Sequence, residues 1–440
     1  MRLPVALFSL ICVATAGAQT PNAPVPSPGP SLTLTREQAE QLALKNNPNI
    51  SISKLLALAQ HQVVREVRSR ELPDLQGSLA AVQPNDNANR ISAIGLTASR
   101  TIQHVGTGVE LSQLITDFGR TSNLVASSRY SERAQIANAQ ATADDIVLAT
   151  DQAFYNALEA QATLRVANQT ETARKTVRDQ ITALTNSKLK STLDQSFAEV
   201  ALSQAQMLVL DAQNNLDASF AQLNQIIGLG RTDGFTLLDD TTPLPPPPPD
   251  SASLVSAALQ HRPDLAALQD TQQAAEKFRV AQRDQMLPTV GALGTVGATP
   301  VGDTQDFPEK WYGAVGLSVD VPIFNGFRYS ADAQEAALRA RAAGERVRDL
   351  HDRITRDVIT SALSANTAYK RVIVTGQLLK QSNLALSLAQ TRYQLGLSSI
   401  VELSQAQLQQ TEAAIADANA RYQYRFAISA LNFQTGMQQP

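Results

Sequence analysis

The sequence contains the same unit twice, and this duplication limits the folds open to the chain more than any other feature. Landmarks recur at an offset of 215 or 208 positions: Pro48 with Pro263, Pro73 with Pro288, Arg120 with Arg328, Leu223 with Leu431, and Gly228 with Gly436. Landmarks that keep their order at so long a spacing indicate two copies of one arrangement of helices and strands. We therefore expect a fold with internal pseudo-symmetry.

Proline-rich segments separate the copies from the N-terminus and from each other. The N-terminal apolar run ends in small residues, as in a secretory signal peptide, and it contains Cys12, the only cysteine of the chain. The middle segment holds five consecutive prolines, which favour a stiff extended strut. The predicted divisions are a signal peptide (1–18), a lead-in (19–32), a first repeat (33–228), a linker (229–250) and a second repeat (251–440).

Each copy begins with two helices divided by a proline. Thr35 and Gln38 form a capping-box pattern at the first start, and Asp250 or Ser251 is the expected start in the second copy. The short helix should end just before the proline, because the residue preceding a proline disfavours the helical region. Longer helices are then predicted over residues 50–71 and 265–286, each ending at a Leu-Pro pair.

Two extended segments follow in each copy, and the second copy gives the cleaner pattern. Its apolar or small face comprises Trp311, Gly313, Val315, Leu317, Val319, Val321 and Ile323. Alternation with period two predicts a strand with one apolar face, long enough to cross a bilayer at the ~9–11 residues that a tilted strand needs. Trp311 and Tyr312 at its start are candidates for an aromatic belt at the membrane interface, with ordinary packing as the alternative.

A long stretch without Gly or Pro, residues 120–227, then predicts helix. One helix of that length would exceed about 150 Å, so a reversal is expected within 185–194, and its counterpart within 393–402. Gly396 suits that reversal because glycine adopts a left-handed conformation without a Cβ penalty. Each copy therefore predicts a long helical hairpin whose first arm has about 65 residues, on the order of 100 Å.

The predicted hairpin tips carry the candidate functional residues. Asp194 and Glu402 occupy equivalent places just after the two tips. Acidic residues at this place favour the start of a helix through its macrodipole. The tip residues themselves are Lys188, Leu189 and Ser191 in the first copy, and Gly396, Leu397, Ser398 and Ser399 in the second.

Composition and motifs exclude several other function classes. The formal net charge of −3 provides no basic footprint for nucleic acid. The four histidines have no ligand-like spacing, so a metal site is not expected. With no phosphate-binding loop and no catalytic constellation, we expect no cofactor and no enzyme activity.

Assembly follows from the strand count. A sheet that spans a membrane can leave no free edge, and the smallest membrane barrels have eight strands. Four strands per chain therefore require several chains, and three chains would supply twelve. We expect a mostly α fold in which duplicated long hairpins form a trimeric α-barrel tunnel and the strands form a shared 12-stranded membrane barrel.

The ordered motifs resemble those of the TolC-like outer-membrane efflux proteins over about residues 33–436. The motifs that carry the resemblance are the proline-ended helices, Asp117-Phe118-Gly119-Arg120, Val321-Pro322-Ile323-Phe324-Asn325-Gly326 and Arg392-Tyr393-Gln394-Leu395-Gly396-Leu397-Ser398-Ser399. The resemblance implies a homotrimer in the lipid of the outer membrane, with an equatorial collar of short helices. It also implies a periplasmic adaptor and an inner-membrane transporter as partners, and tips that contact the adaptor. For Asp194 and Glu402 the resemblance implies a second role beside helix capping, a ring of carboxylates that selects cations at a narrow periplasmic entrance. Gln405 departs from the family, which often has a second acidic residue there.

Two readings of function remain from the sequence. The first is the exit duct of a tripartite efflux or type I secretion system, which passively conducts substrates. The alternative is a structural or adhesive periplasmic coiled-coil protein without a pore. The alternating segments between the helices favour the duct, because a coiled-coil rod has no use for them.

Overall fold

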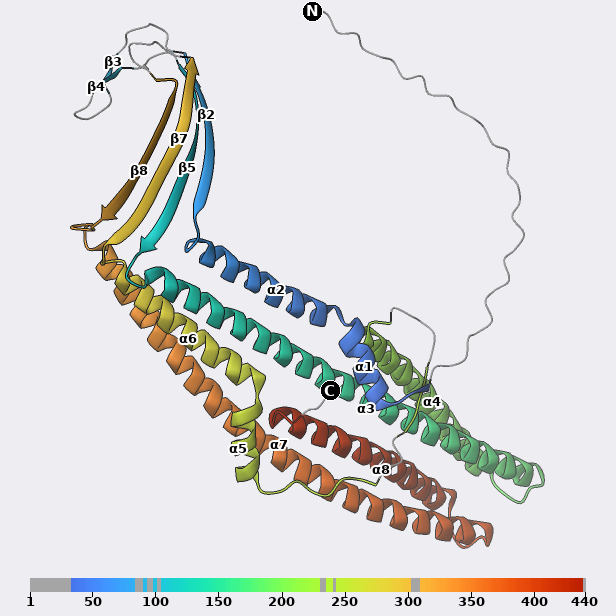
Figure 1. Cartoon of the computed structure of the whole chain (residues 1–440). Helices are drawn as coiled ribbons and strands as arrows, with labels where there is room; N and C mark the ends of the chain where they lie inside the picture. The colour runs from blue at the N-terminus through green and yellow to red at the C-terminus, as the bar shows by residue number, and fades with distance from the viewer. Residues whose placement is uncertain are drawn as a thin grey trace, which may run out of the picture.

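The computed structural model describes residues 33–83, 90–92, 98–100, 104–229, 235–239, 243–301 and 309–437. A small sheet stands at one end of the molecule, and long helices extend away from it toward the other end (Figure 1). The predicted signal peptide and the whole lead-in lie outside the described residues, as does part of the mid-chain linker.

The main sheet joins the two copies. Its four antiparallel strands are ordered β2 (Asp74–Val82), β5 (His104–Thr116), β7 (Thr289–Val301) and β8 (Trp311–Asp320). The central β5–β7 pairing links the first copy to the second, so β2 and β8 are the edge strands. A separate short hairpin pairs β3 (Arg90–Ser92) with β4 (Ala98–Arg100).

Each strand of the sheet leads into or out of a long helix. These helices are α2 (Pro48–Ser69), α3 (Arg120–Asn186), α6 (Pro263–Asp284) and α7 (Arg328–Gln394). Neighbouring helices pack in the same order as the strands, α2 on α3, α3 on α6 and α6 on α7. Chain direction therefore alternates across the helical layer as it does across the sheet.

The two hairpins have the predicted form. Helices α3 and α7 each have 67 residues, about 100 Å at the helical rise. They reverse into α4 (Thr192–Ile227) and α8 (Ile400–Gln434), and both tips lie at the end of the molecule opposite the sheet (Figure 1). Among the helices that the structure describes, none combines the length and apolar character needed to cross a bilayer.

Proline accounts for three boundaries that differ from the sequence prediction, the starts of α2 and α6 and the end of β8. Helices α2 and α6 start at Pro48 and Pro263 rather than two residues later, because a proline fits the first helical position, where no hydrogen-bond donor is needed. Strand β8 ends at Asp320, before Val321 and Ile323, because Pro322 has no N–H for the ladder.

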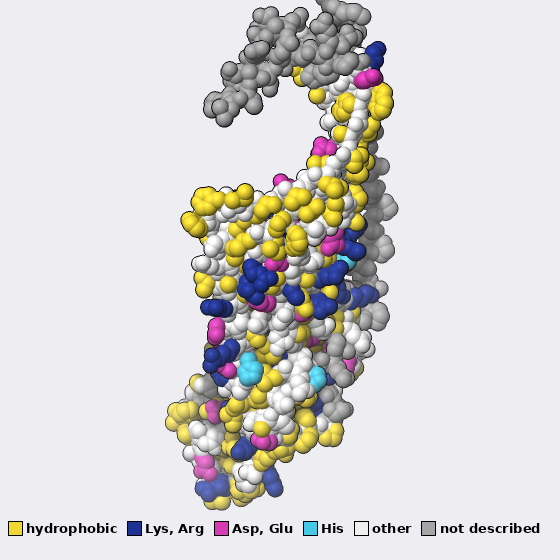
Figure 2. All heavy atoms as spheres, turned by 60° about the vertical axis from the view of Figure 1, so that its left-hand side comes forward, with side chains coloured by type: hydrophobic (Ala, Val, Ile, Leu, Met, Phe, Trp, Pro, Cys, Tyr) yellow, Lys and Arg dark blue, Asp and Glu magenta, His cyan; other side chains and the backbone are white. Residues whose placement is uncertain are grey.

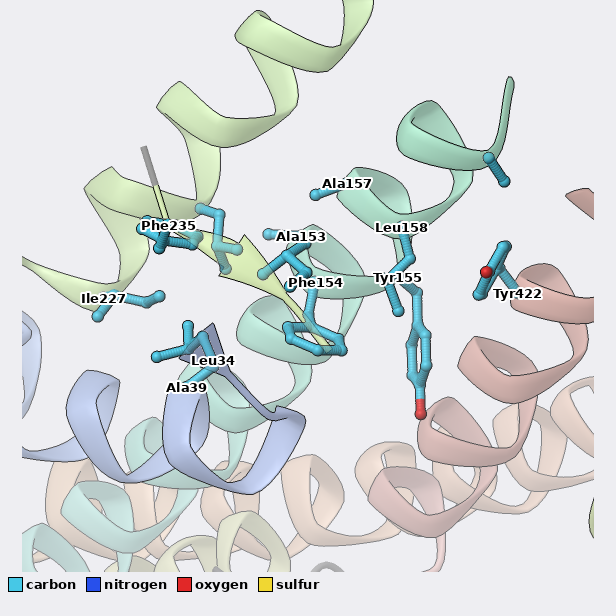
Figure 3. Packing of buried hydrophobic residues seen from close by; sticks show 13 residues of the cluster. Leu34, Ala39, Ala153, Phe154, Tyr155, Ala157, Leu158, Ile227, Phe235 and Tyr422 are labelled. Atoms are coloured by element: carbon cyan, nitrogen blue, oxygen red, sulfur yellow. The ribbon is translucent and has the colours of Figure 1, made fainter. Parts of the chain in front are cut away.

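A packed belt surrounds the middle of the helical layer. Helix α1 (Arg36–Asn46) lies on α3 and α4, and β1 (Thr33–Leu34) pairs in parallel with β6 (Thr236–Leu237) from the linker. Their shared core includes Leu34, Phe154, Leu158, Ile227 and Phe235 (Figure 3). Helix α5 (Ser251–His261) packs on α7 in the second copy.

Two tyrosines of α8 bind the linker to this belt. The fully buried Tyr424 hydroxyl lies 2.9 Å from the carbonyl oxygens of both Pro245 and Pro246. Tyr422 donates to the Asp239 carboxylate at 2.8 Å. The proline strut is thereby fixed against the second hairpin.

Candidate functional site

The two hairpin tips are closed by the same backbone turn. Leu189 N donates to Leu184 O at 2.9 Å, and Leu397 N donates to Arg392 O at 2.8 Å, 208 positions later. The residue before each leucine is left-handed, with φ of 58° at Lys188 and 73° at Gly396. This combination is the Schellman motif, which satisfies carbonyl groups left open at a helix end.

The tips project a matched pair of apolar side chains. Leu189 is 70% exposed and Leu397 is 68% exposed. Each follows a turn whose backbone is held by hydrogen bonds, so the leucine is presented from a rigid loop. An exposed large aliphatic side chain at the same place in both copies is a candidate contact for a partner protein.

One serine after each tip caps the next helix. Ser191 Oγ accepts from Asp194 N at 3.1 Å, and Ser399 Oγ accepts from Glu402 N at 3.4 Å. Ser398, in contrast, is half-buried with a hydroxyl that has no hydrogen-bond partner among the described residues. Of these two neighbouring serines, Ser399 is therefore the one that caps α8.

The two acidic residues after the tips have different partners. Asp194 completes a capping box, because its carboxylate accepts from Ser191 N at 3.3 Å. Glu402 lies 3.3 Å from Arg392 Nε across the second tip. Asp194 thus stabilises the start of α4 within one chain, whereas Glu402 is held by an ion pair that spans the turn.

A shared core fixes the two tips to each other. Lys190 Nζ lies 4.2 Å from the ring centroid of Tyr393, a cation–π contact from the first tip to the second hairpin. Burial, followed by the charge of Asp194, raises the pKa of Tyr393. The apolar cluster beneath comprises Ile181, Ala198, Ala389, Tyr393, Ile400, Leu403 and Ala406.

Above the tips, polar contacts join the hairpins along α3 and α8. Arg174 is buried and donates to the side-chain oxygen of Gln407, and the Thr170 and Thr411 hydroxyls lie 3.3 Å apart. Burial lowers the pKa of Arg174. Sequence reasoning missed this pair, because the two residues lie 233 positions apart and belong to no repeat landmark.

At the opposite end of the molecule, the two candidate interface aromatics lie on opposite faces of strand β8. Neighbouring residues of a strand point to opposite faces. Trp311, 68% exposed, shares its face with the exposed Val315 and Leu317, whereas Tyr312 pairs with Gly297, where an added Cβ would lie 2.4 Å from the tyrosine ring. Tyr312, 46% exposed, is thus packed over a glycine, while Trp311 lies on the apolar face, and a role for either residue in an aromatic belt stays a prediction.

A small antiparallel sheet attached to two long helical hairpins is the protomer fold of outer-membrane channel proteins. The structure is similar to the Campylobacter jejuni CmeC outer membrane channel, with a TM-score of 0.79 and 16% identity, over 91% of this chain and 85% of that one. It is also similar to the Vibrio cholerae outer membrane protein VceC, with a TM-score of 0.77 and 17% identity, over 91% and 96% of the two chains.

A model of the family described as outer membrane efflux protein matches residues 40–229 and 254–437. The chain belongs to this family. A curated relative, outer membrane protein TolC of Escherichia coli strain K12, is 26% identical over 420 residues, which cover 91% of this chain and 81% of the relative. The predicted TolC-like family, mostly α fold and outer-membrane location with a long periplasmic extension are therefore confirmed.

Proposed function

We propose that three copies of the chain form a continuous duct that conducts substrates out of the cell. The observation that carries this proposal is the direction of the edge strands. Across the order β2-β5-β7-β8 each strand runs opposite to its neighbour. The free edge of β8 can therefore pair antiparallel with β2 of the next copy. Helices α7 and α2 of neighbouring copies would likewise lie side by side and run in opposite directions.

Ring closure would remove the two sheet edges that one chain leaves unpaired. A membrane-spanning sheet with open edges is strongly disfavoured, because unpaired N–H and C=O groups each cost several kcal/mol in lipid. Three copies would bring together twelve strands, an even number within the range of membrane barrels. The helical layers would continue the ring as a tunnel through the periplasm.

In this duct the hairpin tips form the end farthest from the membrane. We assign Leu189 and Leu397 to contact with a periplasmic adaptor, and through it an inner-membrane pump would deliver substrate. Glu402, together with Asp194, would bring negative charge to the tunnel entrance. Efflux and type I secretion share this proposal.

The test compares the duct with the pore-free rod. We expect an outer-membrane protein that migrates as a heat-modifiable trimer and gives discrete conductance in planar bilayers. Deletion of the gene should raise susceptibility to exported compounds or abolish a secreted product. A purified trimer that never conducts ions, in a strain with unchanged export, would favour the structural or adhesive alternative.

A further inference from the structure

A basic cleft of about 530 Å³ lies between α2 and α3, in the part of the helical layer nearest the sheet. Its polar lining comprises His61, Arg65 and Arg68 of α2, and Arg129, Glu132 and Arg133 of α3. Buried Val64 contributes to the lining from α2. We call this feature the arginine cleft. Neither the efflux function nor the repeat landmarks require it.

The arginine cleft carries more positive charge than the carboxylates beside it neutralise. Its one lining carboxylate, Glu132, is taken by His61, whose Nδ1 lies 2.7 Å from the Glu132 oxygen. Arg68 reaches Glu71 only at 3.8 Å. Among the described residues, Arg129 has no hydrogen-bond or ion-pair partner. Four guanidinium groups around one cleft therefore leave a net positive site open to an anion.

The donor set matches a phosphate group better than a lone carboxylate. Arginine presents paired N–H donors in a planar fork that binds phosphate oxygens with two parallel hydrogen bonds. Side chains from two antiparallel helices approach the cleft from both walls, so one phosphate could be held from two sides. The volume falls within the range of about 300–1,000 Å³ usual for small-ligand sites.

The position of the cleft relates it to the membrane. Exposed apolar residues surround the junction of sheet and helices: Leu72, Ile115, Phe118, Ile323, Phe324 and Phe327, each at least 54% exposed. Figure 2 shows hydrophobic side chains gathered at this junction on one face, with Lys and Arg side chains beneath them. Arg68 lies one residue before the end of α2 at Ser69, and the exposed Leu72 follows three residues after that end. A headgroup layer is roughly 5–8 Å thick.

The cleft also opens on a definite side of α3. Arg133 precedes Asp151 by 18 residues, five helical turns, so the two lie on one side of the helix. Asp151 lies 3.5 Å from Arg36 of α1 there. In the proposed trimer, α1 belongs to the outer belt, so the cleft faces outward beneath the membrane. The outward orientation of the cleft and the effect of a bound lipid on the barrel rest on the proposed trimer.

We propose that the arginine cleft binds the phosphate headgroup of an acidic phospholipid in the periplasmic leaflet of the outer membrane. The acyl chains would lie against the apolar junction, and the phosphate would accept hydrogen bonds from Arg68, Arg129 and Arg133. Acidic lipids are attracted to such basic sites at a membrane surface. The bound lipid would fix the depth of the barrel in the membrane.

The experiment measures lipid binding to the detergent-purified trimer by native mass spectrometry. The probe is short-chain phosphatidylglycerol, with phosphatidylcholine of equal chain length as the zwitterionic comparison. The test variant is Arg129→Gln with Arg133→Gln, and the control is Arg353→Gln with Arg356→Gln, two exposed arginines of α7. We expect the test variant to bind phosphatidylglycerol about tenfold more weakly, since charge-assisted hydrogen bonds are lost, and the control to bind as wild type.

A separate arm titrates inorganic phosphate and distinguishes the source of the anion. Phosphate should compete with phosphatidylglycerol in the wild type only at much higher concentration. Equal affinity for free phosphate and for the lipid would overturn the lipid assignment, and equal lipid binding by wild type and test variant would overturn the site. Trimer yield and export, measured on the same variants, report independently on the duct.

Discussion

Lys188 and Gly396 occupy equivalent positions at the two hairpin tips, and both are left-handed, with φ of 58° and 73°. A left-handed conformation costs a non-glycine residue roughly 1–2 kcal/mol. The first tip therefore carries a strain that the second avoids. An added Cβ at Gly396 would meet nothing within 4 Å, so the penalty for a side chain there is backbone strain alone.

We predict that Gly396→Val blocks export while trimers still form and insert. Valine adds the whole left-handed penalty, with the further restriction of a β-branched side chain, and so distorts the turn that presents Leu397. The matched change Lys188→Val should act more mildly, because lysine already bears most of that penalty. Drug-susceptibility assays and cysteine cross-linking of each tip to the adaptor measure the effect. Full export by Gly396→Val would mean that Gly396 serves only to form the turn and has no role in export.

The same comparison predicts a stabilising change. Lys188→Gly should relieve the strain of the first tip, with a net gain of at most about 1 kcal/mol, because glycine loses more freedom on folding. Hydrogen exchange of the Leu189 amide would report it as slower opening of the turn. Faster exchange in the variant would mean that the lysine stem stabilises the loop by more than its backbone costs.

Much of this fold could be predicted from the sequence because the duplication tests each element twice. The length of the stretch without Gly or Pro required a first tip near Lys188, where no glycine marks it, and the offset of 208 then placed the second tip at Gly396. The alternation from Trp311 predicted β8 through its period. The short helices were found because proline and capping residues act locally.

Contacts between the copies could not be predicted in this way. Arg174 with Gln407, and Tyr424 with the carbonyl groups of Pro245 and Pro246, depend on which helices become neighbours in space. The periodicity of the sequence carries no information about which helices become neighbours. Likewise, the period of β8 placed Trp311 and Tyr312 on opposite faces, but the packing of Tyr312 over Gly297 depends on which strand becomes its neighbour.

The faces of β8 give a prediction for membrane insertion. Arginine at Leu317 or Val319, which are 74% and 61% exposed on the apolar face, should cost about 2–4 kcal/mol near the bilayer midplane. The yield of heat-modifiable trimer should fall accordingly. Ser318→Arg, on the other face, should be tolerated. Equal losses from neighbouring positions would contradict the assignment of the faces.

The entrance acids give a prediction for ion selectivity. Asp194 is turned back onto its capping box, whereas Glu402 is held by Arg392 across the tip. Replacing both with amides should lower cation preference in planar-bilayer recordings at unchanged trimer yield, because a ring of negative charge is removed. Glu402→Gln alone should give the larger part of the change. A reversal potential that stays at the wild-type value in the double variant would leave the acids with capping and ion pairing only.

Glu40 gives a prediction for pH dependence in the belt around the helices. Its carboxyl, 6% exposed, shares one arginine with Asp151, 1% exposed: Arg36 Nη1 lies 2.9 Å from Glu40 and 3.5 Å from Asp151. Burial, followed by the hydrogen bond and charge of Asp151, raises the pKa of Glu40 from 4.5 to about 8. The folded state thus holds a proton that the unfolded chain releases near its ordinary pKa.

Between these two pKa values the folded state binds more protons, so stability is present in full below about pH 4.5 and is lost as pH rises through about 8. We expect the melting temperature of the trimer to fall by on the order of 5 °C from pH 5 to pH 9. Glu40→Gln should flatten that slope, because an amide needs no proton to stay neutral. Glu66→Gln, at an exposed carboxyl of α2 that has no contact with Arg36, is the control and should keep it. Parallel pH profiles for wild type and Glu40→Gln would place the titrating group elsewhere in the molecule.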